Sequence, residues 1–471
     1  MESNNVGARE VKRESWGSGF GFVMAAAASA IGLGNIWRFP YLAGDNGGGA
    51  FILIYLIAMV LIGFTVLLCE FIVGRGGQSN AIDSFRKLVP GSFWWIAGAF
   101  GVMAAFFIIS FYIVVSGWTM AYVWMTLQGV FAGVPADQMR DIHVNFISDP
   151  ILPLIWMTIF MALTVAIVAG GIKGGIEKAS LYLLPPVVVI LIIFMIRGLT
   201  LEGSMAGVSF LLSPDFSQIT GTVVLVALGQ AFFSLSLGMG VMITYGSYVK
   251  KQENIPVAAR RVVVYDTAVA ILAGFAVFPA VFAVGLAPEQ GPGLVFIVLP
   301  AVFNTLPLGM FFGTLFFFLL AIAALTSAVS ILEVLVAFVK ERLNISRVTA
   351  ALSVGFFFLL MGVTASLSWG PWSHILVPFP GVEGGLNLFG FYDRISSRIL
   401  LPLAGLFTCL FVAWGWQYRN SVKEITNDGQ LNFVWLPVFK IMVSFVAPIV
   451  IFLVLLNGLG VLEWVGGLIN N

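Results

Sequence analysis

Eleven long apolar runs shape this sequence, and each can cross the ~30 Å hydrocarbon core of a bilayer as a helix. A helix satisfies its own backbone hydrogen bonds, which the membrane interior requires of any segment that spans it. The sequence therefore predicts an all-α polytopic membrane protein with eleven transmembrane helices. The runs lie near residues 16–41, 49–74, 93–128, 151–168, 177–198, 221–247, 258–287, 308–340, 347–368, 389–417 and 434–460.

Composition and isolated reactive residues exclude several other classes. Only 10% of the residues are charged, whereas soluble domains carry about 25%. The net charge of +1, without a long basic run, argues against a nucleic-acid partner. Cys69 and Cys409 lie in apolar runs, and His143 and His374 stand alone, so we expect no structural disulfide and no Cys/His metal site. The spans contain no nucleophile–base pair, and we do not expect an enzyme.

The distribution of Lys and Arg predicts the orientation in the membrane, because cytoplasmic loops are enriched in these residues. With a cytoplasmic N-terminus, 17 of the 23 basic residues lie inside, and an odd number of spans puts the C-terminus outside. Short tails and outer loops without an Asn-X-Ser/Thr sequon favour a bacterial plasma (inner) membrane. The inner set is Arg9, Lys12, Arg13, Arg75, Arg86, Lys87, Lys173, Lys178, Lys250, Lys251, Arg260, Arg261, Lys340, Arg342, Arg347, Arg419 and Lys423.

Two of the spans contain glycines that interrupt a helix. The first holds IGLGNIWRFP at residues 31–40, and the sixth holds SLSLGMG at residues 234–240. Glycine inside a helix costs about 1 kcal/mol relative to alanine, and unwound backbone at membrane depth is tolerated where it lines a cavity. The breaks lie five spans apart, which predicts two inverted repeats, 16–198 and 221–417, with 434–460 as an extra span. The alternative is that these glycines only allow close helix packing.

Broken helices offer free N–H groups to anions and free carbonyls to cations. Asn35 follows the first break, Ser234 opens the second, and Asp266 lies in the seventh span, so these oxygens can together hold one cation. A second oxygen cluster lies in the eighth span at 323–327, where the i, i+3, i+4 spacing puts Ala323, Thr326 and Ser327 on one face. Alternatively, Thr and Ser hydroxyls in membrane helices bond back to their own backbone.

Charges near the ends of the spans suggest gates. Arg38 lies just outside the first break, and Asp393 lies at the outer start of the tenth span, so the two can form a salt bridge above the site. Arg13, just before Trp16, can pair with Glu341 at the inner mouth in the same way. The alternative for each is a solvated loop charge. Glu70, deeper in the second span, can accept N–H groups from unwound backbone.

Several long motifs resemble those of one family. The stretch VKRESWGSGFGFVMAAAASAIGLGNIWRFPYLAGDNGGG at residues 11–49 is similar to the signature of the neurotransmitter:sodium symporter family. The similarity continues through GQAFFSLSLGMG at 229–240, GPGLVF at 291–296 and LTS at 325–327. The chain resembles the bacterial branch with eleven spans. The resemblance implies the LeuT fold, a 5+5 inverted repeat with unwound spans 1 and 6, and sodium-coupled symport of a small hydrophobic amino acid by alternating access.

The resemblance also implies a site for two sodium ions and one substrate. The first ion would be held by the carbonyl of Ala30 with Asn35, Ser234, Asp266 and the substrate carboxylate. The second would be held by carbonyls of Ala28, Ile31 and Ala323 with the hydroxyls of Thr326 and Ser327. Tyr112 has an alternative role as an aromatic anchor, and the apolar positions can be ordinary packing. The implied substrate residues are Ala30, Leu33, Gly34, Ile108, Tyr112, Phe233, Ser234, Ser236, Met239, Ser327 and Ile331.

Departures from the family pattern refine these expectations. Animal members bind chloride with a Tyr, a Gln, a Ser and a further Ser in the seventh span. Tyr55, Gln230 and Ser234 match the first three, but Ala270 stands at the position of the second Ser. Asp266 stands where those relatives have Asn, so we expect its charge to replace chloride. Met239 is flexible and polarizable, which predicts a pocket that accepts aromatic side chains.

The inner part of the fifth span carries a further expected feature. Gly175 and Pro185 resemble the family's point of unwinding in span 5, although proline-kinked helices are common in membranes.

Two other functions are alternatives to sodium-coupled symport. A sensor of the same fold would bind an amino acid without transporting it. A proton-coupled carrier would lack the Thr326 and Ser327 hydroxyls or would place a basic side chain at the second ion, and this sequence does neither. The expected partners are the lipid bilayer and the amino acid, without an obligatory protein partner.

Overall fold

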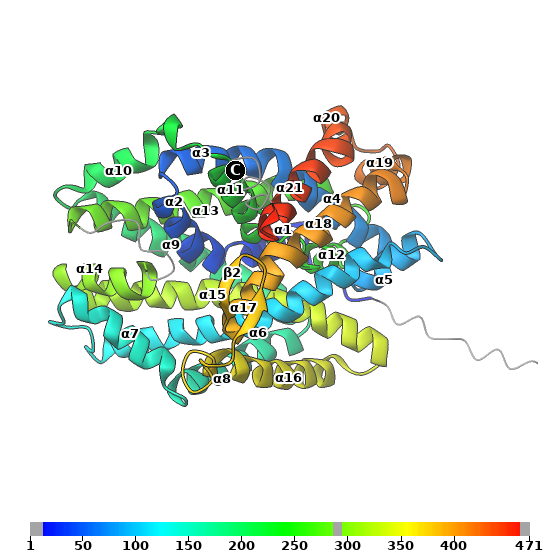
Figure 1. The fold of residues 1–471 in the computed structure, drawn as a ribbon. Coiled ribbons are helices and arrows are strands. Elements are labelled where there is room, and N and C mark those ends of the chain that lie inside the picture. The colour runs from blue at the N-terminus through cyan, green and yellow to red at the C-terminus, as the bar shows by residue number, and fades with distance from the viewer. Residues whose placement is uncertain (1–12, 286–293, 462–471) are drawn as a thin grey trace, which may run out of the picture.

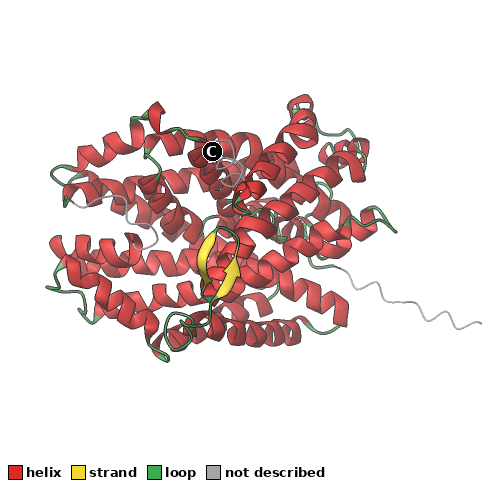
Figure 2. Ribbon diagram, viewed as in Figure 1, coloured by secondary structure: helices red, strands yellow, loops and turns green. Residues whose placement is uncertain are grey.

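The computed structural model describes residues 13–285 and 294–461, and this part of the chain is almost entirely helical (Figure 1, Figure 2). Arg9, Lys12, the end of the seventh predicted span and Gly291–Gly293 of one motif lie outside the described residues. One antiparallel hairpin, β1 (Val377–Phe379) and β2 (Val382–Leu386), interrupts the helices. The all-helical prediction missed this hairpin, whose Gly384 and Gly385 have positive φ values.

Nine helical stretches in the described residues are long and apolar enough to span a membrane, and each lies on a predicted span. Five are single helices, one begins with a π-helical turn, and in the other three a π-helical turn joins two helices. They are α3–η2–α4 (Gly49–Ala58, Met59–Gly63, Phe64–Gly77), α6 (Trp95–Leu127), α8 (Leu152–Ala169), η4–α9 (Ile172–Glu177, Lys178–Leu199), α13 (Ile255–Ala283), α15 (Gly309–Leu343), α16 (Arg347–Leu367), α17–η7–α18–η8 (Leu388–Arg394, Ile395–Leu400, Leu401–Leu410, Phe411–Gly415) and α20–η9–α21 (Leu436–Ile441, Met442–Val446, Ala447–Gly458).

Two predicted spans are broken, and they are the first and the sixth. α1 (Gly19–Ala30) ends before η1 (Gly34–Arg38) and α2 (Phe39–Asp45), with a bend of 45°. Six residues, 235–240, separate the end of α11 (Gly221–Ser234) from the start of α12 (Val241–Gly246). Gly238 and Gly240, in between, both have a φ of 73°, which L side chains rarely adopt. The bent first pair raises the number of spans to ten among the described residues, and eleven stays a prediction.

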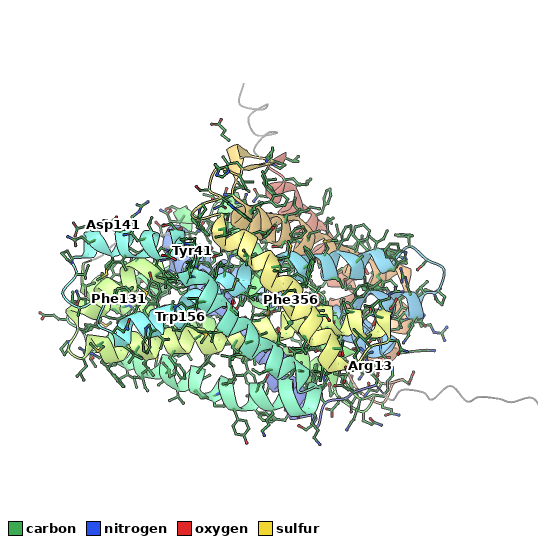
Figure 3. The ribbon with its side chains drawn as sticks, turned by 90° about the horizontal axis from the view of Figure 1, so that it is seen from below. Arg13, Tyr41, Phe131, Asp141, Trp156 and Phe356 are labelled. Atoms are coloured by element: carbon green, nitrogen blue, oxygen red, sulfur yellow. The ribbon has the colours of Figure 1, made fainter. Side chains whose placement is uncertain are left out.

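Shorter helices cover the two ends of the bundle. α7 (Met139–Ser148), α10 (Ser204–Leu212) and α14 (Leu299–Thr305) lie at one end, and α5 (Ala81–Leu88) and α19 (Tyr418–Ile425) lie at the other (left and right in Figure 1). Figure 3 likewise places Arg13 at one end, and Phe131 and Asp141 at the opposite end. The remaining short turns are η3 (Ala136–Gln138), η5 (Phe216–Gln218) and η6 (Leu294–Val298).

α1 lies in the middle of the bundle, in contact with α9, α13 and α15. Four consecutive alanines, Ala25–Ala28, are almost completely buried and let these helices approach α1 closely. The broken first span is therefore surrounded by protein, which satisfies the condition for unwound backbone at membrane depth. The limits of the two repeats stay a prediction.

Candidate functional site

The two helix breaks contact each other. The Gln230 side-chain amide on α11 donates to the carbonyl of Gly34 in the first break at 2.7 Å. A Cβ on Gly34 would lie 3.2 Å from the Phe233 ring and 3.5 Å from the Cα of Ser234. Glycine at position 34 therefore allows the first break to lie directly against the end of α11.

Three residues predicted to hold the first cation meet at this junction. The Asn35 amide donates to Asp266 Oδ1 at 2.8 Å and to Ser234 Oγ at 3.1 Å, and Ser234 Oγ donates to Asp266 Oδ2 at 2.7 Å. The Tyr55 hydroxyl lies 3.3 Å from Ser234 Oγ and donates to Asp266 Oδ2 at 3.4 Å. Ala30, the fourth predicted residue, is the last residue of α1.

The Asp266 carboxylate is completely buried, and its hydrogen-bond donors are neutral. Among the described residues, no Lys or Arg lies within 4.0 Å of it. A buried carboxylate without a basic partner is costly unless a cation or a proton neutralises it. The junction therefore has the chemistry of a site for a small cation.

The second predicted cluster lies where the C-terminal end of α1 meets α15. Thr326 Oγ1 donates to the carbonyl of Ala323 at 3.0 Å, and Ser327 Oγ donates across to the carbonyl of Ser29 at 2.9 Å. Ala28 lies in the last turn of α1, and Ile31 caps it, so both contribute to this helix end, where carbonyls lack partners within the helix. The Thr326 hydroxyl does bond back to its own helix, as the alternative reading expected.

Ser29 was not predicted, although it links three elements. Its carbonyl also accepts from Ser236 Oγ at 3.1 Å, and its hydroxyl donates to Ser330 at 2.7 Å. A single serine in an alanine-rich helix carries no sequence signal of such a position.

The predicted substrate residues gather around the first break. Leu33, Ile108, Tyr112, Met239 and Ile331 are each exposed by less than 5%, and Ser236 by 5%. The Tyr112 hydroxyl faces Ser327 and the Leu33 N–H, and it lies 3.2 Å from where a Gly32 Cβ would be. The hydroxyl is buried and forms no hydrogen bond with the described residues. A buried hydroxyl without a partner is suited to a ligand oxygen.

The outer gate differs from the predicted salt bridge. The guanidinium carbon of Arg38 lies 4.4 Å from the centre of the Phe233 ring, in a cation–π contact. Asp393 interacts electrostatically with Arg38, but no ion pair within 4.0 Å joins them in the described chain. The guanidinium thus lies over the aromatic ring, and the direct Arg38–Asp393 bridge is not formed in this structure.

The inner end is closed by the segment that precedes α1. Arg13 pairs with Glu341 at 2.5 Å and donates to Ser247 Oγ at 2.6 Å. The Trp16 indole N–H donates to the carbonyl of Tyr245 at 3.0 Å. The predicted Arg13–Glu341 contact is thus present, with Trp16 buried beside it.

Glu14 is a member of this inner cluster that the sequence did not reveal. Its carboxylate accepts from Lys340 at 2.8 Å, from Arg347 at 2.9 Å and from the backbone N–H of Ile172 at 3.1 Å. Burial raises the pKa of Glu14, but the hydrogen bond from Lys340 and the charge of Arg347 outweigh it and lower the pKa from 4.5 to about 2.

Glu177 and Glu333 are further acidic residues of the inner cluster that were not predicted. Glu177 accepts the N–H of Gly17 at 2.7 Å, and the buried Glu333 pairs with Arg347 at 2.7 Å. We call residues 13–17 together with these partners the inner clasp. Its members lie far apart in the sequence, so no local motif marks them.

Two expectations about backbone have different outcomes. Glu70 accepts the N–H of Gly238 in the second break at 2.7 Å, as expected. The fifth span is helical throughout from Ile172 to Leu199 and is not unwound between Gly175 and Pro185. A Cβ on Gly175 would lie 2.0 Å from the carbonyl of Ile167, so this glycine has a packing role here.

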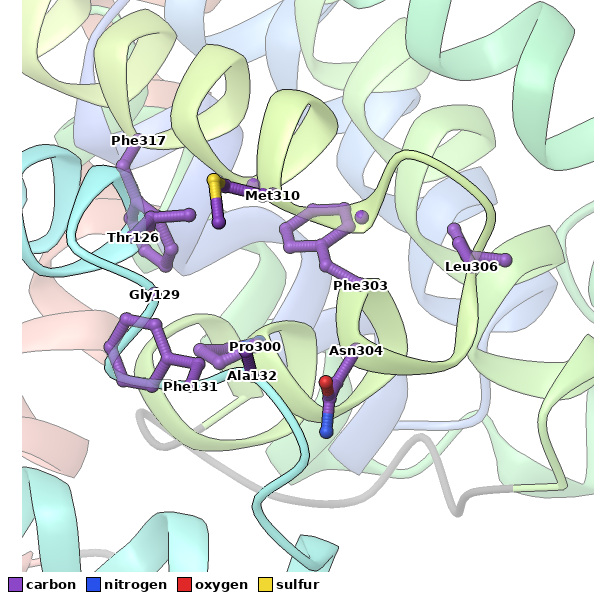
Figure 4. Close-up of a pocket in the computed structure, with 12 residues that line it drawn as sticks. Thr126, Gly129, Phe131, Ala132, Pro300, Phe303, Asn304, Leu306, Met310 and Phe317 are labelled. Atoms are coloured by element: carbon purple, nitrogen blue, oxygen red, sulfur yellow. The ribbon is translucent and has the colours of Figure 1, made fainter.

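A separate cavity of about 210 Å³ lies at the end where α6, α14 and α15 meet (Figure 4). Phe131, Phe303 and Met310 give it an apolar wall, and none of the predicted site residues lines it. Asn304 holds its rim by accepting from the N–H of Gly133 at 2.9 Å and donating to the carbonyl of Val134 at 3.0 Å.

Comparison with known proteins agrees with the geometry. The family described as "Sodium:neurotransmitter symporter family" matches residues 13–138 and 136–464. The chain belongs to this family. An uncharacterized sodium-dependent transporter of Bacillus subtilis (strain 168) is 41% identical over 97% of this chain and all of the relative. One from Haemophilus influenzae is 36% identical over 98% of this chain and all of the relative. The crystal structure of MhsT in complex with L-phenylalanine is 46% identical, with a TM-score of 0.87 over 95% of this chain and all of that one.

These similarities establish the class. The protein is a multi-pass membrane transporter of the LeuT fold that depends on sodium, and it is not an enzyme. The roles of individual residues, the number of ions and the substrate are subjects of the proposal below.

Proposed function

We propose that this transporter carries hydrophobic L-amino acids, including aromatic ones, into the cell together with two sodium ions. The observation that carries the proposal is the buried Asp266 carboxylate between the two helix breaks. Asn35, Ser234 and Tyr55 hold it, and no Lys or Arg of the described residues lies within 4.0 Å. Its negative charge favours a cation, and the helix ends beside it favour a zwitterionic substrate. MhsT, similar over most of the chain, was crystallised with L-phenylalanine.

The substrate carboxylate would meet the N–H groups of Leu33 and Gly34 and the unpartnered Tyr112 hydroxyl. In this position it would complete the shell of the first sodium ion, so each would strengthen the binding of the other. Ile108, Met239 and Ile331 would contact the side chain, and Met239 adapts to large groups because its thioether is flexible.

Alternating access would use the contacts at the two ends of α1. Phe233, with Arg38 on its ring, would close the outer side after binding, and Asp393 would approach Arg38 at that step. Release of the inner clasp would then open the cytoplasmic side, with the N-terminus inside and the C-terminus outside. The membrane potential favours this direction, because each net positive charge moved inward gains about 2.3 kcal/mol per 100 mV.

Transport should not require chloride. The Asp266 carboxylate already lies beside Tyr55 and Ser234, two of the residues that match the chloride ligands of animal relatives. A second anion beside a buried carboxylate would be repelled strongly in this low-dielectric place.

Uptake of radiolabelled leucine, phenylalanine and tryptophan into proteoliposomes tests the proposal. An inward sodium gradient should give accumulation, potassium or choline in place of sodium should abolish it, and gluconate in place of chloride should leave it unchanged. Binding without accumulation in any cation would favour a sensor, and accumulation driven by a proton gradient alone would favour a proton-coupled carrier. Strict chloride dependence would refute the assignment of Asp266 as the fixed anion.

A further inference from the structure

A groove on the outside of the helix bundle is separate from the transport pathway. It has a volume of about 480 Å³ and lies between α4, the first turns of α13, and α20 with the residues just before it. Its walls include Leu61, Phe64, Val264 and Met442. None of the residues assigned to sodium, substrate or gates lines it.

One wall of the groove is a packed structure and not a loose loop. Phe433, which precedes α20, lies 6.5 Å from the ring of Phe64 on α4 and 6.5 Å from the ring of Phe439 on α20. These aromatic contacts tie the segment before α20 to two spanning helices. The groove is therefore preformed.

The groove has the depth of about one bilayer leaflet. On α13 its lining runs from Asn254, at the helix N-terminus, to Val264. Ten residues of helix correspond to about 15 Å, which is half of the ~30 Å hydrocarbon core. An acyl chain entering at the helix N-terminus would therefore lie along the whole groove.

The groove also carries a positive charge, on a residue about 9 Å along α13 from Asn254, and side chains of a helix tilt back toward its N-terminus. Arg260 is the only charged residue among those that line it, and its neighbour Arg261 is also exposed. Neither residue forms an ion pair within the described chain. Asn254 and Asn432 add polar side chains at this end, and Trp435, 64% exposed, has the amphipathic ring typical of the membrane interface.

We propose that this groove binds an anionic phospholipid, with its phosphate at Arg260 and an acyl chain between α4, α13 and α20. An apolar channel of one-leaflet depth excludes a soluble anion as the occupant, and the unpaired guanidinium favours a negatively charged headgroup over a zwitterionic one. Arg260 and Arg261 belong to the basic set predicted on the cytoplasmic side, where anionic lipids attract such residues.

The test measures which lipid the purified transporter retains. The full chain is equilibrated in detergent with equimolar dioleoyl phosphatidylglycerol and dioleoyl phosphatidylcholine, and bound lipids are counted by native mass spectrometry. The wild type should retain phosphatidylglycerol in excess. Arg260→Gln should lower the ratio of phosphatidylglycerol to phosphatidylcholine about fivefold. The matched control Arg261→Gln lies outside the groove and should change this ratio less than half as much.

A second variant tests the apolar part of the groove. Val264→Trp places a large ring on an exposed position of the wall and should displace both lipids without changing the oligomeric state. The thermal unfolding midpoint of each variant, measured without added lipid, shows that it is folded. Equal losses in Arg260→Gln and Arg261→Gln, unchanged retention in Val264→Trp, or a change of oligomeric state in Val264→Trp relative to the wild type would each overturn the proposal.

Discussion

The carboxylate of Asp266 is bound by neutral donors in a place that water does not reach, and this determines what its substitution should do. Asp266→Asn keeps the shape but removes the charge, and it replaces one of the two acceptor oxygens with an NH2 donor. Since hydrogen bonds and ion contacts to a buried charge contribute about 1.5–3 kcal/mol, we expect sodium affinity to fall by at least about tenfold.

The same substitution tests the chloride argument. Without the fixed charge, Tyr55, Gln230 and Ser234 surround a neutral site, and substrate binding should begin to depend on chloride. Equilibrium binding of labelled leucine, titrated with sodium in chloride and in gluconate, measures both effects. Asp215→Asn, at an exposed position, is the control that should leave the titration unchanged. Wild-type sodium affinity in Asp266→Asn would rule out a role of the charge.

His143 on α7 gives a prediction about pH. It lies with its ring stacked 5.6 Å from Phe296, and its Nδ1 is 2.9 Å from the Tyr122 hydroxyl. Burial lowers the pKa of His143 from 6.5 to about 4. When α7 is released, His143 binds a proton below pH 6.5, but in the packed state it does so only below about pH 4.

The stability that comes from neutral His143 is therefore complete above pH 6.5 and is lost as the pH falls toward 4. The loss should reach about 1–3 kcal/mol. Hydrogen exchange of residues 139–148, followed from pH 7 to pH 4 with correction for intrinsic rates, measures it. His143→Gln cannot titrate, and it should remove this part of the pH dependence. An identical pH profile in His143→Gln would show that other groups are responsible.

At the scale of elements, the inner clasp shows how a short segment controls a helix. Glu14 contacts α15, α16 and the start of η4, and Gly17 contacts Glu177. Glu14→Gln removes two ion pairs that are partly exposed, so the loss should be about 1–2 kcal/mol. Hydrogen exchange of residues 14–22 should then become about tenfold faster.

Glu202→Gln, an exposed acid far along the chain from the clasp, is the matched control for Glu14→Gln. It should leave exchange in residues 14–22 unchanged. Protection that is equal in Glu14→Gln and the wild type would show that Arg13 and Trp16 suffice to hold the segment.

Local patterns predicted the elements well, whereas contacts between distant residues were mostly not predictable. Length and hydropathy placed the spans, and paired glycines placed both breaks, because these properties reside in consecutive residues. The hairpin at 377–386 was missed, since glycines around so short a strand pair give no periodic signal.

In the candidate site, too, contacts between residues far apart in the sequence were mostly not predictable. Asn35, Ser234 and Asp266 were proposed together because each stands beside a break or in a span. Glu14, Ser29 and Glu177 were missed, because their partners become neighbours only when the helices pack. The direct Arg38–Asp393 bridge is absent for a related reason: the sequence could not show that the guanidinium lies over the Phe233 ring.

For the molecule as a whole, the predicted bias of Lys and Arg toward the cytoplasmic side gives an orientation in the membrane that can be measured. Asp141 and Lys423 are both exposed and belong to helices at opposite ends, α7 and α19 (Figure 1). Replacing the buried Cys69 and Cys409 with serine gives a background for single cysteines. A membrane-impermeant maleimide added to intact cells should label Asp141→Cys but not Lys423→Cys. The reverse result would invert the proposed orientation.

The two ends of α1 are held very differently, and this makes the helix a lever. It has 12 residues and is therefore about 18 Å long. The carbonyl of Ser29 near one end is fixed by the hydroxyls of Ser236 and Ser327, which makes that end a pivot. The other end is held by the clasp and by the packing of Phe22 on Phe71, and a rotation of about 10° around the pivot would swing it by about 3 Å. A slight rearrangement around an ion would thereby be amplified into an opening wide enough for water.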